Sequence, residues 1–77
     1  MPVSDATRQE VIRTMLLCQQ AWAKAAAAVE NWEQMKWLNS RWVAALDAMD
    51  EALIADANVR IAIKLAKAEA AEVKRNA

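Results

Sequence analysis

Residues 31–42 read NWEQMKWLNSRW and contain three of the four tryptophans of the chain, Trp32, Trp37 and Trp42. Each residue of an α-helix turns the chain by about 100°, so a step of five residues carries a side chain about 140° beyond a full turn. The three rings would therefore point to three sides of one continuous helix. This spacing predicts a corner in the chain, with Trp32 and Trp42 facing one interior from either side of it and Trp37 projecting elsewhere.

The composition of the 77 residues around this stretch is that of a helical protein. The chain has no Gly, and its single Pro is Pro2, so it lacks the residues from which tight β-hairpin turns are built. Ala, Leu, Glu, Lys, Gln, Arg and Met dominate, and these are the strongest helix formers. We expect an all-α fold, a long antiparallel helical hairpin that forms one domain over residues 1–77.

Two apolar stripes of helical period run along the chain. The first follows an uninterrupted heptad pattern and consists of Val11, Met15, Cys18, Trp22, Ala25, Val29 and Trp32. The second consists of Met35, Leu38, Trp42, Leu46, Met49, Leu53, Ala57, Ile61, Leu65 and Ala68. On one helical wheel the second stripe starts well over 100° away from the first, so a straight helix cannot hold both on one side. Either the chain reverses between the stripes, which we expect, or one long helix serves two partners.

The predicted helices span about residues 5–38 and 41–75, with the turn near Asn39-Ser40. Asn tolerates the left-handed conformation that ends many helices, and Ser is a favoured N-cap residue. A turn at Asn31 is the alternative, and a further break at residues 56–58 would give three helices. Ser4 or Thr7 is expected to cap the first helix.

The chain is too short to bury both stripes by itself. Below about 70–80 residues a single core rarely supplies more than ~3–5 kcal/mol, and one cysteine, Cys18, cannot form an internal disulfide. A stripe of small residues, Ala45, Ala48, Ala52 and Ala55, flanks the second helix and would let another helix approach closely. We therefore expect a homodimer that forms a four-helix bundle.

Residues that carry chemistry are scarce. The absence of His removes the usual general base and the commonest metal ligand. Cys18 lies within the first stripe and is expected to be an inert core thiol. Asp47, Asp50 and Glu51 share one helix side, but the Glu-x-x-His pairs of carboxylate metal bundles are missing, so a solvated acidic face is expected. We predict no catalytic residue, cofactor, metal site or small-molecule substrate, and hence no enzyme.

The charge pattern argues against nucleic acid and membranes as partners. The formal net charge is zero, which gives no overall attraction to either. No apolar run approaches the roughly 18–20 residues that span a bilayer, and no signal peptide is visible, so a cytoplasmic protein is expected. Residues 30–58 carry six acids against two bases, whereas residues 59–77 carry five bases against two acids. The main interpretation is two solvated faces, and the alternative is that the complementary ends help to set pairing in an oligomer.

The functional hypothesis is a protein–protein interaction module that binds a larger cytosolic protein and modulates or inhibits it, with a phage or another mobile element as the expected source. Trp is enriched at interaction hot spots. The predicted partner-binding residues are Trp37, Arg41, Ala45, Ala48 and Ala52. The alternative is a structural protein that assembles through its leftover apolar faces, and a weaker third hypothesis is a DNA-binding regulator.

Overall fold

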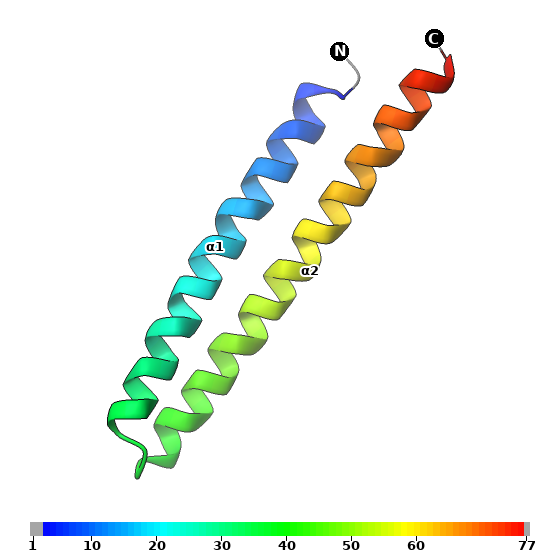
Figure 1. Cartoon of the computed structure of the whole chain (residues 1–77). Helices are drawn as coiled ribbons and strands as arrows, with labels where there is room; N and C mark the ends of the chain where they lie inside the picture. The colour runs from blue at the N-terminus through cyan, green and yellow to red at the C-terminus, as the bar shows by residue number, and fades with distance from the viewer. Residues whose placement is uncertain (1–2, 77) are drawn as a thin grey trace.

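The computed structural model describes residues 3–76 and folds them into two antiparallel helices that lie side by side (Figure 1). Helix α1 is Asp5–Gln34 and helix α2 is Asn39–Asn76. With 30 and 38 helical residues, 92% of the described residues are helical and none is in a strand. The hairpin is a rod of 61 × 14 × 13 Å. The all-α helical hairpin predicted from composition and period is thus confirmed. We call the end where α1 begins and α2 finishes the open end, and the other the turn end (Figure 1).

The connection occupies residues 35–38, so the prediction of a turn at Asn39-Ser40 was wrong; these two residues form the first turn of α2. Asn31 and residues 56–58, the alternative breaks, lie inside helices. Met35 ends α1, and its N–H donates to the carbonyl oxygens of Asn31 at 3.2 Å and Trp32 at 3.0 Å. None of the described residues has a positive φ. The chain reverses without the left-handed residue that the Asn signal presumes, which is why that signal failed.

At the open end Ser4 caps α1, as one of the two predicted alternatives had it. The Thr7 N–H donates to Ser4 Oγ at 3.2 Å, so Thr7 lies inside the first turn rather than at the cap. Both residues also bind Glu69 of α2. The Ser4 N–H donates to Glu69 Oε1 at 2.6 Å, and the Thr7 hydroxyl donates to Glu69 Oε2. One carboxylate thereby ties the start of α1 to the far part of α2.

Small side chains form the seam between the helices. The buried residues are Thr14, Ala25, Ala45, Ala48, Ala52 and Ala62. The Thr14 hydroxyl donates to the carbonyl oxygens of Glu10 and Val11, both at 3.0 Å, so its polar atom is satisfied inside α1. Buried and half-buried residues follow a heptad pattern on each helix. On α1 the residues of this pattern are Thr7, Val11, Thr14, Cys18, Ala21, Ala25, Ala28 and Trp32, and on α2 Ala45, Ala48, Ala52, Ala55, Val59, Ala62, Ala66 and Glu69. Val29, Met49, Asp56 and Ala70 are also half-buried and lie beside it.

This alanine seam corrects the predicted packing. The first predicted stripe is right in every second position, because Val11, Cys18, Ala25 and Trp32 lie in the seam. Met15 and Trp22, however, are 44% and 41% exposed. The second predicted stripe, through Leu46, Leu53, Ile61 and Leu65, is exposed, and the alanines predicted to flank it take its place. Large side chains do not fit between two helices that approach this closely, so they lie beside the seam.

Cys18 is half-buried rather than a full core residue. Its Sγ lies 4.0 Å from Asp56 Oδ1, so the thiol can act as a weak donor to a carboxylate. The apolar surroundings that we expected from the sequence are therefore only partly present. A serine at this position could keep the interaction with Asp56.

The seam predicts that enlarging a buried alanine is harmful. Ala52→Leu should lower the unfolding free energy by about 1–3 kcal/mol, because the larger side chain cannot be placed between the helices without moving them apart. Ala57→Leu on the exposed side of the same helix is the matched control and should change stability by less than about 0.5 kcal/mol. Chemical denaturation compares the two. Equal effects would show that Ala52 does not lie in a close seam.

Glu69 predicts acid sensitivity at the open end. The Thr7 hydroxyl, followed by the Ser4 N–H and hydroxyl, holds the pKa of the Glu69 carboxyl below its ordinary value of 4.5, against a small opposing effect of burial. A lowered folded-state pKa means that the carboxylate stabilises the fold at neutral pH, and that this contribution is lost as the pH falls through the lowered pKa. When the unfolding free energy is measured from pH 7 to pH 3, the Glu69→Gln variant should lose less stability over this range than the wild-type protein. Exposed Glu72, replaced by Gln, is the control and should keep the wild-type profile.

Candidate interaction surface

The hairpin exposes much more surface than a compact protein of its mass. Its solvent-accessible surface is 5834 Å², whereas a compact 8.6 kDa monomer exposes about 4,700 Å². Large apolar side chains account for a substantial part of it. Those exposed by more than a third are Ile12, Met15, Leu16, Leu17, Trp22, Trp37, Trp42, Val43, Leu46, Leu53, Ile54, Ile61, Ile63, Leu65 and Val73. The alanine seam is the cause, because it displaces these side chains to the flanks.

One flank forms a nearly continuous apolar surface across both helices. A shallow hollow is lined by Trp22, Ala25, Ala26, Val29 and Glu30 of α1 and by Met49 of α2. Residues seven apart on a helix share a side, which extends this surface along the rod. We call it the Trp22 face, made of Ile12, Met15, Trp22, Val29, Trp42, Leu46, Met49 and Leu53. Its eight side chains are all large and apolar, which is what helix-packing surfaces require.

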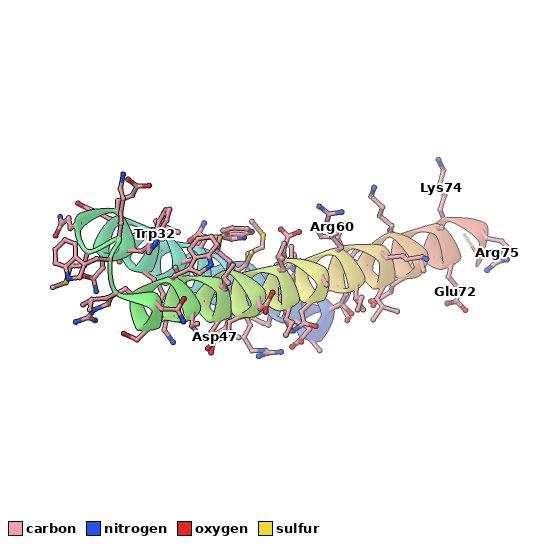
Figure 2. All side chains as sticks on the ribbon, turned by 90° about the horizontal axis from the view of Figure 1, so that it is seen from below. Trp32, Asp47, Arg60, Glu72, Lys74 and Arg75 are labelled. Atoms are coloured by element: carbon pink, nitrogen blue, oxygen red, sulfur yellow. The ribbon has the colours of Figure 1, made fainter. Side chains whose placement is uncertain are left out.

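The opposite flank is a mixture of apolar and charged groups. Two hollows there are lined by apolar residues of both helices, Leu17, Ile54, Ile61 and Leu65, which we call the Leu17 face. Ion pairs border it. Lys24 Nζ lies 3.1 Å from Glu51 Oε2 across the seam, and Arg13 Nη2 lies 2.5 Å from Glu10 Oε1 along α1. The two flanks also differ in the charges they project: Figure 2 shows Arg60 and Lys74 on one side of the rod and Asp47 and Glu72 on the other.

The three tryptophans of residues 31–42 lie as their spacing predicted. The rings of Trp32 and Trp42 pack across the helices, with centroids 4.7 Å apart and planes tilted by 44°. Trp37 lies in the connection and is 75% exposed. The paired rings close the seam at the turn end, where Figure 2 shows Trp32. The ring of Trp37 projects into solvent.

The predicted partner-binding residues divide into two groups. Trp37 and Arg41 are exposed at the turn end, where another protein could reach them. Ala45, Ala48 and Ala52 are 0%, 6% and 0% exposed, because they pack against α1 within the chain. These three alanines are therefore removed from the candidate surface.

Sequence reasoning missed Trp22 as a surface residue. It follows the half-buried Cys18 by four residues and precedes the buried Ala25 by three. This position places the ring beside the seam rather than in it, once the alanine heptads are taken as the seam.

Among residues 3–76 no cluster of three or more His, Cys, Asp or Glu side chains could hold a metal ion. Neither of the two helices contains a stretch long and apolar enough to cross a membrane. No protein-family model matches this chain, and no curated protein or solved structure is significantly similar to it.

The tryptophan geometry makes a prediction in which the three rings behave differently. Trp32→Ala and Trp42→Ala should each lower the unfolding free energy by about 1.5–3 kcal/mol, because each removes a partly buried ring and its aromatic partner. Trp37→Ala should cost less than about 0.5 kcal/mol, since its ring is already in water. Denaturant unfolding of the three variants at one protein concentration tests this order. A destabilisation by Trp37→Ala as large as that by Trp32→Ala would place Trp37 in the core.

Proposed function

We propose that this chain is a non-enzymatic protein–protein interaction module of the cytoplasm. It forms a homodimer, a four-helix bundle, and as a dimer it binds and modulates a larger protein. The observation that carries the proposal is the inverted distribution of side-chain size: alanines fill the seam inside the hairpin, and Trp, Leu, Ile and Met side chains lie outside it. An apolar surface on this scale is typical of interaction sites rather than of monomeric proteins.

The magnitudes favour association. Six of the eight side chains of the Trp22 face are at least 38% exposed. Completing the burial of a half-exposed side chain of this size contributes about 1 kcal/mol, so the twelve such side chains in a dimer contribute on the order of 12 kcal/mol. The loss of translational and rotational freedom costs about 4–15 kcal/mol. With a cost near the lower end of this range, the balance of about 8 kcal/mol corresponds to a dimer that is stable at micromolar concentration.

Trp37 and Arg41 are the residues proposed to bind the larger protein. Both are exposed at the turn end, away from the middle of the Trp22 face. Trp and Arg are the residue types most enriched at interaction hot spots, because a large ring or a planar guanidinium supplies contact area and directed hydrogen bonds. Their exposure without a role in the seam supports a task outside the hairpin.

An alternative function, assembly into a larger scaffold, is supported by the Leu17 face. This second apolar surface stays exposed when the Trp22 face is covered, and a chain with two associating faces can extend beyond a dimer. The charged pairs that border the Leu17 face make it the weaker of the two surfaces. A closed dimer is therefore the preferred form.

Sedimentation equilibrium tests the association. The wild-type chain of 8.6 kDa should sediment at twice that mass at micromolar concentration. Trp22→Glu should shift the mass to that of the monomer, because it places a charge in the middle of the apolar face. The control is Ala27→Glu, which adds the same charge at an exposed position of the same helix and should leave the dimer intact.

A helical, well-folded wild-type monomer under these conditions would contradict the module. A mass that keeps rising with concentration would support the scaffold instead. Binding to the larger protein is tested with an affinity-tagged dimer, in which Trp37→Ala should abolish capture of the same protein while the dimer mass stays unchanged.

A further inference from the structure

The charged side chains that border the Trp22 face change sign from one end of the rod to the other. Near the open end Arg60, Lys67 and Lys74 follow one another at seven-residue intervals and so share one side of α2. Figure 2 shows Arg60 and Lys74 projecting from the same side. Near the turn end Glu30 lines the hollow that contains Trp22, and Glu33 lies seven residues after Ala26, which lines it too.

Two of these side chains also have partners three or four residues away in the sequence. Arg60 Nε lies 3.1 Å from Asp56 Oδ2, and Glu33 Oε2 lies 3.4 Å from Lys36 Nζ. Both pairs are largely exposed, so they attenuate the contrast between the ends and do not remove it.

The contacts between the helices show which residue of α1 lies beside each residue of α2, and so where each charge lies along the rod. They are Trp32–Trp42, Lys24–Glu51, Cys18–Asp56 and Thr7–Glu69. By this register Lys67 lies at about the level of residue 7 of α1. The apolar residues that α1 contributes to the Trp22 face run from Ile12 to Val29, and their midpoint is near residue 20. Glu33 and Lys67 therefore lie at similar distances on opposite sides of this midpoint, roughly 20 Å away at 1.5 Å per residue.

We propose that a second copy of this chain covers the Trp22 face in antiparallel orientation, with the turn end of each hairpin over the open end of the other. This arrangement rests on the proposed dimer and specifies its interface. A two-fold axis near the level of residue 20 brings Glu30 and Glu33 of each copy opposite Lys67 of the other, and Lys74, seven residues further along α2, lies about 10 Å beyond them. A surface that is apolar in the middle and opposite in charge at its two ends is complementary to itself under such an axis. Parallel alignment would set lysines against lysines and glutamates against glutamates.

The size of the face agrees with this occupant. One whole broad side of the 61 × 14 Å rod, which comprises the Trp22 face and the charged ends that border it, offers a footprint of about 850 Å². Two copies give about 1,700 Å², within the range of roughly 1,200–2,000 Å² of stable interfaces. The antiparallel dimer also carries the two copies of Trp37 to opposite ends of the bundle. A partner bound at each Trp37 would then be held apart from the other.

Distances between spin labels decide the orientation. The labelled protein is the full chain with Cys18→Ser and with Asn39→Cys, which provides a single attachment point at an exposed position of the turn end. Pulsed electron–electron double resonance should give a label separation of about 45–50 Å in the antiparallel dimer. About 30 residues of helix, at 1.5 Å each, lie between the turn end of one copy and that of the other. A separation below about 25 Å would show a parallel dimer and overturn the proposal, while leaving the proposed dimeric module in place.

Charge reversal tests the pairing of the ends independently. Lys67→Glu with Lys74→Glu should raise the dissociation constant of the dimer at least about tenfold at low salt, because acidic ends then face each other in both symmetric contacts. Adding Glu30→Lys and Glu33→Lys to the same chain exchanges the ends and should restore the dissociation constant to within about threefold of wild type. The matched control is Lys24→Glu on the opposite flank, which should leave it unchanged.

The outcomes separate the two proposals. A monomeric wild-type protein contradicts the proposed function itself. A dimer that resists Trp22→Glu and is broken by Leu65→Glu places the interface on the Leu17 face and overturns the inference alone. A dimer for which the charge exchange fails to rescue affinity overturns the pairing of the ends.

Discussion

The close approach of the two helices along the alanine seam is the constraint on which the rest of the structure depends. Helices that meet through alanine have axes near the lower limit of the usual 8–10 Å range, which leaves no room between them for Leu, Ile or Trp side chains. The seam positions of α2 from Ala45 to Ala62 are small at every step but one, Val59. The large apolar side chains must therefore lie on the flanks, and the surface proposed for interaction follows from the interior of the hairpin.

The same constraint links folding to association. Buried alanine methyl groups contribute little free energy, whereas ordering a residue of backbone costs about 1–2 kcal/mol. The stronger local contacts are at the two ends of the rod, the Trp32–Trp42 pair and the Glu69 carboxylate on Ser4 and Thr7. Between them the hairpin has few large contacts of its own. Anything that covers the Trp22 face binds the folded chain only, so the apparent stability of the fold rises with the concentration of the occupant.

The fold class could be predicted from the sequence, but the packing could not. Absence of Gly and internal Pro, with helix-forming residues throughout, is enough to predict two long helices, and the five-residue spacing of the tryptophans is enough to place a corner between Trp32 and Trp42. The turn itself was misplaced because Met35 ends α1 by ordinary backbone hydrogen bonds, which leave no mark in the sequence. The seam was misjudged because a heptad of large residues and a heptad of alanines run one position apart, and size was taken as the sign of burial. Trp37 was recognised as exposed, whereas the Trp22 face becomes visible only when the alanines are known to be inside.

The charged residue at a seam position of the heptad contacts the other helix, whereas the nearby lysines on the flank face solvent. Glu69 occupies a seam position, where its carboxylate accepts hydrogen bonds from Ser4 and Thr7 at the positive N-terminal end of α1. Its charge is compensated within the chain and is not offered to a partner. Lys67 and Lys74 lie on the flank, two residues before and five after it, and their charges face outward beside the Trp22 face. Because a shift of one or two residues along a helix turns a side chain by about 100–200°, neighbouring charges of one short segment can hold the hairpin together and, in the proposed dimer, orient the second copy.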